Sequence, residues 1–188
     1  NEIQKTSAKY FKETTQGYGA ALRKGMEEST CDYIVLCEPD STFNSNDIFK
    51  FLSYIDDFEC IFGTRTTKSL IQKGAKMQFY LRVGNIVVAK ILEYLYFGPT
   101  LSDVGCTYKM ISRSSYEKIK NNLRVAGSEF QPELMIQLIL NKVRILEIPV
   151  NYLEREGKSK ITYNFISSFQ LAIKMLLLIF RLRIKNIF

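Results

Sequence analysis

Short apolar runs alternate along the chain with segments in which apolar residues recur every three or four positions. The runs 33–36 and 58–62 have the length of strands, and the segment 48–55 between them has helical spacing. Strand, helix and strand in this order predict right-handed crossovers and a mostly parallel sheet flanked by helices, which is the α/β class. Because 33–36 is apolar throughout, we expect it to be a buried central strand.

The same patterns continue through the second half of the chain. Helical spacing marks 71–98 and 128–140, and an alternating strand is expected after the loop at 101–105. The segment 143–150 is expected at the edge of the sheet, because its Pro149 cannot donate a hydrogen bond to a neighbouring strand.

A glycine-rich turn containing Gly17 and Gly19 leads into an amphipathic helix. Its spacing matches neither the GxxxxGK[ST] nor the GxGxxG phosphate-binding motif. Helix packing, or a shaped wall near a ligand, is therefore favoured over direct phosphate binding.

Two carboxylates, Glu38 and Asp40, follow the first strand directly and flank a proline. Ligands of open α/β sheets bind at the carboxyl ends of the strands. An acidic pair at that place is suited to a hard divalent cation that bridges substrate phosphates. The alternative is a solvated turn.

Arg65 follows the second strand and is therefore expected on the same edge of the sheet as the acidic pair. It is either an ion-pair partner of the carboxylates or a phosphate clamp. Hydroxyl groups at 64, 66 and 67 favour the clamp. Asp103 lies in a loop that could supply a further carboxylate to a site, or it caps its own backbone in a turn.

Basic residues cluster in the loop 152–160, which could fold over an anion, although most charge runs are solvated faces. The net charge of +7 points to an anionic partner: nucleic acid, a membrane surface or a phosphorylated substrate. Nucleic acid is disfavoured, because the cations are spread over loops and an apolar helix and no aromatic and basic RNA motif is present. The chain has no histidine and four scattered cysteines, which disfavours zinc and histidine-based catalysis and favours reduced thiols in a cytosolic compartment.

The segment 165–188 is expected to form a separate amphipathic helix that follows a domain at 1–164. Such a helix is about 36 Å long, enough to cross a hydrocarbon core of roughly 30 Å. Lys174 near mid-membrane would cost about 2.5–3.5 kcal/mol, so a helix at the membrane interface is favoured over a core helix and over a spanning helix. Its polar stripe comprises Ser167, Gln170, Lys174, Arg181 and Lys185. The segment 71–98 mixes apolar and basic residues and fits a lipid-facing helix and a core helix equally well.

The order of the motifs resembles that of the inverting family 2 glycosyltransferases, and most closely the polyprenyl-phosphate (dolichol-phosphate mannose synthase-like) sugar transferases. The resemblance covers about 16–164. Its motifs are QGYGAA at 16–21, EPD at 38–40, GTR at 63–65, DVGCTYK at 103–109, IPVNY at 148–152 and REGKSK at 155–160.

This resemblance implies a GT-A fold, a nucleotide-sugar donor, Mg²⁺ or Mn²⁺, and a polyprenyl-phosphate acceptor at the cytoplasmic face of a membrane. It implies that Glu38 and Asp40 hold the metal, with Thr42 as a further ligand. It places Asp103, with Gly17 and Gly19, on the donor side, and it makes Asp40 and Asp103 catalytic. The residues implied to bind the acceptor phosphate are Arg65, Arg82, Arg155, Lys158, Ser159 and Lys160.

The chain departs from the family pattern in two ways. The first acid is Glu38 rather than aspartate, so its side chain is one methylene longer. The opening βαβ segment, which holds the nucleotide base in the family, is not found before Asn1. The chain is therefore expected to be a piece of a longer protein, or else a catalytically incomplete domain that acts as a membrane-associated partner.

Overall fold

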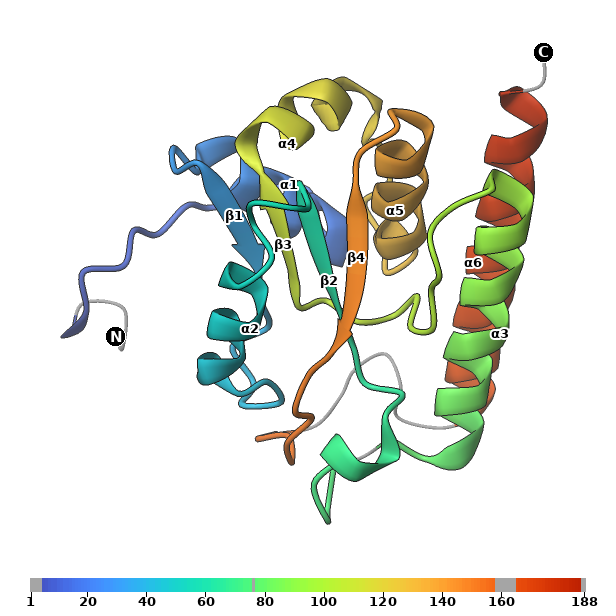
Figure 1. Cartoon of the computed structure of the whole chain (residues 1–188), viewed down its shortest axis with the longest axis horizontal. Coiled ribbons are helices and arrows are strands. Elements are labelled where there is room, and N and C mark those ends of the chain that lie inside the picture. Colours follow the sequence, from blue (N-terminus) through green and yellow to red (C-terminus); the bar gives the residue numbers. More distant parts are fainter. Residues whose placement is uncertain (1–4, 76, 158–164, 187–188) are drawn as a thin grey trace.

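The computed structural model describes residues 5–75, 77–157 and 165–186. Its centre is a four-stranded sheet in the order β1-β3-β2-β4 (Figure 1). The strands are β1 (Tyr33–Leu36), β2 (Cys60–Thr64), β3 (Lys109–Ser112) and β4 (Ile145–Pro149). β4 pairs with β2 in parallel, whereas β3 is antiparallel to both β1 and β2.

The sheet is therefore mixed, with β1, β2 and β4 pointing in one direction and β3 inserted against them. This insertion corrects the expected place of β1, which is an edge strand in the described part of the chain rather than a central one. Its burial alternates accordingly: Ile34 and Leu36 are buried, while Val35 is 39% exposed. β4 lies at the opposite edge, as predicted from Pro149.

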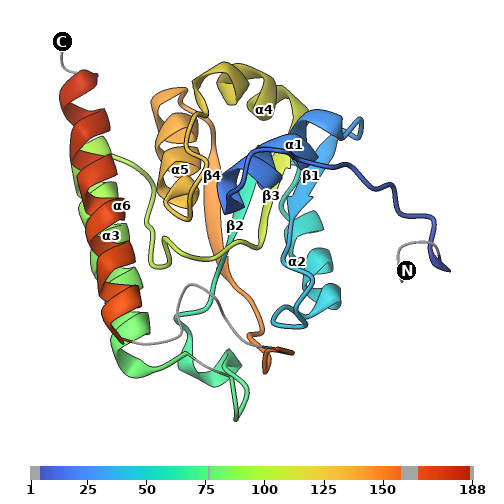
Figure 2. The same cartoon turned by 180° about the vertical axis from the view of Figure 1, so that it is seen from behind.

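Helices cover both faces of the sheet (Figures 1 and 2). One face packs on α1 and α5 through a large core that includes Met26, Phe62 and Leu134, and the other packs on α2 through Phe51 and Ile61. α3 and α6 lie side by side and pack against α5 at the β4 end of the molecule. The helix bounds are α1 (Tyr18–Glu28), α2 (Ile48–Leu52), α3 (Phe79–Tyr96), α4 (Arg113–Ile119), α5 (Phe130–Leu140) and α6 (Phe165–Lys185).

The third helix is shorter than its apolar pattern predicts, because it begins at Phe79 rather than near 71. A turn precedes it, in which Gly74 has a positive φ of 105° that an L residue rarely adopts. Ile71 instead forms a bridge with Tyr152, which ties this segment to the chain after β4. The helix ends at Phe97, whose left-handed φ of 51° closes the last turn.

Close packing at Gly63 determines where the chain leaves β2. All five residues of β2 are buried, and the Gly63 amide donates to the Tyr108 carbonyl at 2.8 Å. A Cβ at this position would lie 2.8 Å from the same carbonyl oxygen. The absence of a side chain therefore lets β2 approach the 103–109 segment and places Arg65 beside it.

We predict that Gly63→Ala lowers the free energy of unfolding by about 1–3 kcal/mol, because the new methyl group overpacks a backbone contact. Urea unfolding measures the change. The matched control is Gly25→Ala, since Gly25 lies within α1 and a Cβ there would meet nothing within 4 Å. That substitution should stabilise the protein by roughly 0.5–1 kcal/mol. Equal stability of Gly63→Ala and the wild type would show that the contact is not tight.

Candidate functional site

A cavity of about 580 Å³ opens where β1 and β2 end, facing α3 and α6. Its polar end is formed by Glu38, Asp40, Arg65 and Arg155. Its other wall is largely apolar and is formed by side chains of α3 and α6, among them Tyr80, Leu81, Val88, Phe169 and Met175. The sheet edge predicted from the sequence thus does bring the acidic pair and Arg65 to one place.

The turn after β1 holds Asp40 firmly. Ser41 has a left-handed φ of 64°, and Thr42 then reaches back to Asp40. The Thr42 amide and hydroxyl donate to Asp40 Oδ1 at 3.1 and 2.5 Å. Burial opposes ionisation of Asp40, but the hydrogen bonds from Thr42, the contact with Glu38 and the charge of Arg155 together outweigh it, so the pKa of Asp40 lies below its ordinary value. Thr42 thus orients the carboxylate of Asp40.

The second oxygen of Asp40 faces a cation. Arg155 Nη2 lies 2.8 Å from Asp40 Oδ2 and 3.6 Å from Glu38 Oε2. Asp40 Oδ2 is nevertheless buried and has no hydrogen-bond partner among the described residues. Two carboxylate oxygens therefore converge on one positive group, and Asp40 Oδ2 is paired with it by charge without the geometry of a hydrogen bond.

This arrangement fits a divalent cation. Hard carboxylate oxygens are the protein ligands that Mg²⁺ and Mn²⁺ prefer, and Mg²⁺ in particular is commonly held by one or two carboxylates with the remaining ligands from phosphates and water. In the described part of the chain, no group of three or more His, Cys, Asp or Glu side chains gathers. Asp40 and Glu38 would thus supply only part of the metal's ligand shell.

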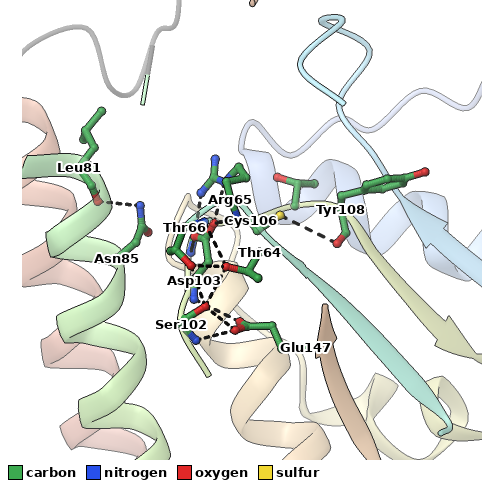
Figure 3. A network of polar contacts seen from close by, with 12 residues as sticks. Thr64, Arg65, Thr66, Leu81, Asn85, Ser102, Asp103, Cys106, Tyr108 and Glu147 are labelled. Atoms are coloured by element: carbon green, nitrogen blue, oxygen red, sulfur yellow. Dashed lines mark hydrogen bonds and ion pairs between the residues drawn. The ribbon is translucent and has the colours of Figure 1, made fainter. Parts of the chain in front are cut away.

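Arg65 is held by Asp103 in a bidentate ion pair (Figure 3). Asp103 accepts from Arg65 Nε at 2.8 Å, from Nη2 at 2.9 Å and from the Arg65 amide at 2.9 Å. Burial raises the pKa of Asp103, but the Arg65 charge and hydrogen bonds more than compensate, so the pKa lies below its ordinary value. Arg65 is among the described residues that line the cavity, whereas Asp103 is not.

Asp103 is 1% exposed and contacts Arg65 from behind the cavity wall, and its expected catalytic and donor-side role stays a prediction. It also accepts from the Gly105 amide at 3.1 Å, which is the local turn contact considered as the alternative. Arg65 is paired with Asp103 and not with the acidic pair Glu38 and Asp40, and it lies on the cavity wall, so its role as a phosphate clamp stays a prediction.

Glu147 of β4 and a group of hydroxyl side chains support this ion pair (Figure 3). Glu147 Oε2 accepts from the Ser102 amide and hydroxyl at 2.7 and 2.6 Å, and Oε1 accepts from the Asp103 amide at 3.1 Å. The Ser102 hydroxyl also contacts the hydroxyls of Thr64 and Thr66 at 2.8 and 3.0 Å. These two threonines therefore bind within the protein, which corrects the expectation that they add donors to a phosphate clamp.

Of the other residues expected to bind the acceptor phosphate, one lies away from the cavity and three lie outside the described residues. Arg82 lies over the Phe79 ring on α3, with 5.8 Å from Cζ to the ring centroid, and is not among the described residues that line the cavity. Lys158, Ser159 and Lys160 lie outside the described residues.

Gly17 and Gly19 pack closely on the 125–127 loop, in line with the interpretation favoured from the residues, and the donor-binding role implied by the resemblance stays a prediction. A Cβ on either glycine would come within 2.6 Å of a backbone oxygen of the 125–127 loop, and the Gly19 amide donates to Ala126 at 2.8 Å. The cavity is instead lined by Tyr18, which lies between them.

Two cavity residues, Tyr18 and Gln131, were missed from the sequence. Gln131 Nε2 donates to the Tyr18 hydroxyl at 2.9 Å, and the Tyr18 hydroxyl contacts Thr107 Oγ1. Thr107 in turn donates to Glu38 Oε1 at 2.7 Å. The position of Tyr18 between two glycines was a usable signal, but nothing local in the sequence connects Gln131 with Glu38.

The α6 helix has three distinct faces. Its buried face, with Met175 and Ile179, packs on α3 and α5, and Ile179 O accepts from the Tyr96 hydroxyl at 2.8 Å. A second, exposed face is apolar and comprises Phe169, Ile173, Leu177, Phe180 and Ile184. The exposed basic residues Lys174, Arg181 and Lys185 lie between these two faces, given about 3.6 residues per turn. By length and composition, α6 could cross a membrane.

Several known proteins are similar to this chain in sequence, and solved structures are similar to it in fold. A dolichyl-phosphate hexose transferase of Haloferax volcanii is 28% identical over 160 residues, which are 84% of this chain and 66% of the relative. A low-salt glycan biosynthesis hexosyltransferase of the same organism is 26% identical over 78% of this chain and 35% of its own length. The dolichyl-phosphate beta-glucosyltransferase of Saccharomyces cerevisiae is 24% identical over 76% of this chain and 46% of its own length. The chain thus spans between about a third and two thirds of these relatives.

Among solved structures, glucosyl-3-phosphoglycerate synthase of Mycobacterium tuberculosis, in complex with Mn²⁺, UDP and glucosyl-3-phosphoglycerate, superimposes with a TM-score of 0.59. The match has 13% identity and covers 88% of this chain and 55% of the synthase. It confirms the expected GT-A fold. The sequence model of glycosyl transferase family 2 matches residues 2–120. The chain therefore belongs to glycosyl transferase family 2.

Proposed function

We propose that the protein transfers a hexose from a nucleotide-sugar donor to a polyprenyl phosphate such as dolichyl phosphate, at the cytoplasmic face of a membrane. One observation carries this proposal: a single cavity joins an end built from two carboxylates and two arginines to a wall built from two apolar helices. A charged phosphate with a long apolar tail matches both halves. The dolichyl-phosphate transferases to which the chain is similar support the same acceptor.

Asp40 and Glu38 would hold a divalent cation, which neutralises the charge of a leaving diphosphate when it is bound. Asp40 Oδ2 supports this role, because it is buried, is balanced by the charge of Arg155 and accepts no hydrogen bond from the described residues. Thr42 keeps the carboxylate oriented through Oδ1, so that Oδ2 is directed toward the cation. The Mn²⁺ in the structural neighbour is consistent with such a metal.

The two arginines would orient the acceptor. A phosphate is already an anion at neutral pH, so its attack on the anomeric carbon needs no strong general base. Arg65 is suited to hold it, because Asp103 fixes the guanidinium plane through Nε and Nη2. Arg155 lies beside the acidic pair and would contact both the donor diphosphate and the acceptor phosphate. A direct displacement in this arrangement inverts the anomeric centre.

The exposed faces of α3 and α6 would rest on the membrane. The apolar face of α6 is bordered by basic residues, which favour the anionic headgroups of lipids. The opposite face of the helix is packed on α3 and α5, and this favours a helix that lies on the surface over one that spans.

We predict that Asp40→Asn lowers metal-dependent sugar transfer at least about 100-fold, because the cation loses its best-oriented ligand. Transfer of labelled sugar from a panel of nucleotide sugars to polyprenyl phosphate, by the complete protein with Mn²⁺ and after chelation, measures the effect. Mn²⁺ binding followed by electron paramagnetic resonance should weaken in parallel. The control is Asp56→Asn at an exposed position. Undiminished transfer by Asp40→Asn would refute the metal role, and transfer by no form of the protein would favour the partner role.

We predict that Asp103→Asn lowers the free energy of unfolding by about 3–5 kcal/mol at pH 7, because Arg65 keeps its charge and loses its partner. The pKa of Asp103 lies below its ordinary value of 3.8. The contribution of Asp103 to the free energy of unfolding is therefore complete above pH 3.8, and it is lost as the pH falls from 3.8 through the lowered pKa of the folded state. Urea unfolding from pH 7 to 3 should show the gap between variant and wild type closing in acid. A gap that is constant over this range would mean that Asp103 is not ionised in the fold.

We predict that a double variant, Leu177→Glu with Ile184→Glu, abolishes binding to anionic liposomes while leaving the unfolding midpoint within a few degrees of the wild type. Both side chains are at least 60% exposed, so the substitutions remove apolar contact with lipid and little contact within the protein. Co-sedimentation with vesicles measures binding. The control is Phe49→Glu, because Phe49 is 65% exposed on α2, on the other side of the sheet. Unchanged sedimentation of the double variant would exclude this face.

A further inference from the structure

A chain of hydrogen bonds runs from α5 to the acidic pair, and its direction is fixed. Thr107 has one hydroxyl proton and donates it to Glu38 Oε1. In its contact with the Tyr18 hydroxyl, Thr107 must therefore accept, so Tyr18 donates. Burial raises the pKa of Tyr18, so this proton stays in place. The Tyr18 oxygen is then left to accept, and Gln131 Nε2 donates to it at 2.9 Å.

This direction also fixes the orientation of the Gln131 amide. If the amide were turned over, its carbonyl oxygen would face a hydroxyl oxygen that has already donated its proton elsewhere. The donor half of the amide therefore points to Tyr18, and the acceptor half, Oε1, points away from it. Gln131 is the second residue of α5, and its neighbours Phe130 and Pro132 are buried. The backbone from which the side chain of Gln131 extends is therefore packed inside the protein.

Gln131 Oε1 is an acceptor without a donor. The residue is 2% exposed and lines the cavity, yet its Oε1 has no hydrogen-bond partner in the described part of the chain. A buried carbonyl that is left unsatisfied costs roughly 1–3 kcal/mol. A ligand that presents a hydrogen-bond donor to this atom removes that cost, whereas a ligand that presents an anionic oxygen increases it.

We propose that Gln131 Oε1 accepts a hydrogen bond from one hydroxyl of the donor hexose and so determines which hexose is used; this rests on the proposed transferase function. A sugar hydroxyl can donate, whereas the phosphates of the donor and the acceptor present anionic oxygens. The position agrees with this assignment, because Gln131 is linked through Tyr18 and Thr107 to Glu38, one of the two acids beside the expected diphosphate. The hexose is the part of a nucleotide sugar that adjoins the diphosphate.

Such an acceptor discriminates between sugars more strongly than an apolar wall does. A sugar that lacks the hydroxyl, or holds it in the other configuration, leaves the buried Oε1 unpaired. The amide of Gln131 cannot turn its Nε2 toward a different sugar, because this rotation would break the hydrogen bond to the Tyr18 hydroxyl. Tyr18 thus acts as a positioning residue for Gln131.

The test compares Gln131→Met with the wild type on the parent nucleotide sugar and on analogues that are deoxy at one position each. We expect kcat/KM for the parent sugar to fall about 10- to 100-fold in Gln131→Met. At one deoxy position the two proteins should be equally active, and this identifies the hydroxyl that Oε1 binds. The affinity for the nucleoside diphosphate alone should not change. Tyr18→Phe, which retains Oε1 but frees the amide, should relax the selectivity between epimeric sugars while retaining more activity than Gln131→Met.

The matched control is Gln137→Met, on the same helix and buried, but not among the described residues that line the cavity. An equal loss for the parent and every deoxy sugar would overturn the proposal in favour of a purely structural role or a bound water at Oε1. A loss of affinity for the nucleoside diphosphate itself would assign Oε1 to the base. If the wild type binds nucleotide sugars but transfers none, the proposed function fails, and the same comparison made on dissociation constants still decides the role of Gln131. If the wild type binds no nucleotide sugar, both proposals fail.

Discussion

Burial of charge is the constraint on which the polar end of this molecule depends. Arg65, on the cavity wall, and Lys109, behind it, interact with two carboxylates, Asp103 and Glu147. Lys109 is fully buried and donates to the Cys106 carbonyl, and burial lowers its pKa while it raises that of Glu147. Each group is tolerable only because the others are present. The cluster therefore fixes the 101–107 loop, and with it the guanidinium that reaches the cavity.

The chemistry of strand ends could be predicted from the sequence, because it follows from local order. A run of apolar residues followed by Glu38 and Asp40, and a second one followed by Arg65, places all three at one edge of any α/β sheet. The position of β1 could not be predicted in this way. Its four apolar residues are compatible with an edge and with a centre, and the choice was made by β3, which comes from a distant part of the chain and inserts between β1 and β2.

The contacts that were mistaken or missed all depend on partners far apart in the sequence. Asp103 has the local pattern of a turn, and only the fold shows that it pairs with a residue 38 positions away. Close packing at Gly17 and Gly19 was favoured from the sequence, but only the fold shows that their partner is the loop at 125–127. Helical periodicity in α6 likewise predicted an amphipathic helix but not its third face, because the pattern does not distinguish apolar residues packed on α5 from those left exposed.

The contact of Arg155 with both acids would make the proposed metal site selective for ionic charge. A guanidinium attached to the chain already balances Asp40 and Glu38 in part, so any free cation has to compete with it. A monovalent ion would exchange one positive charge for another and would also lose hydration, with little electrostatic gain. A divalent ion carries one more positive charge than the guanidinium and would therefore be attracted more strongly by the two carboxylates. At the proposed metal site, Arg155 would thus disfavour an abundant monovalent ion such as K⁺ without a closed shell of protein ligands.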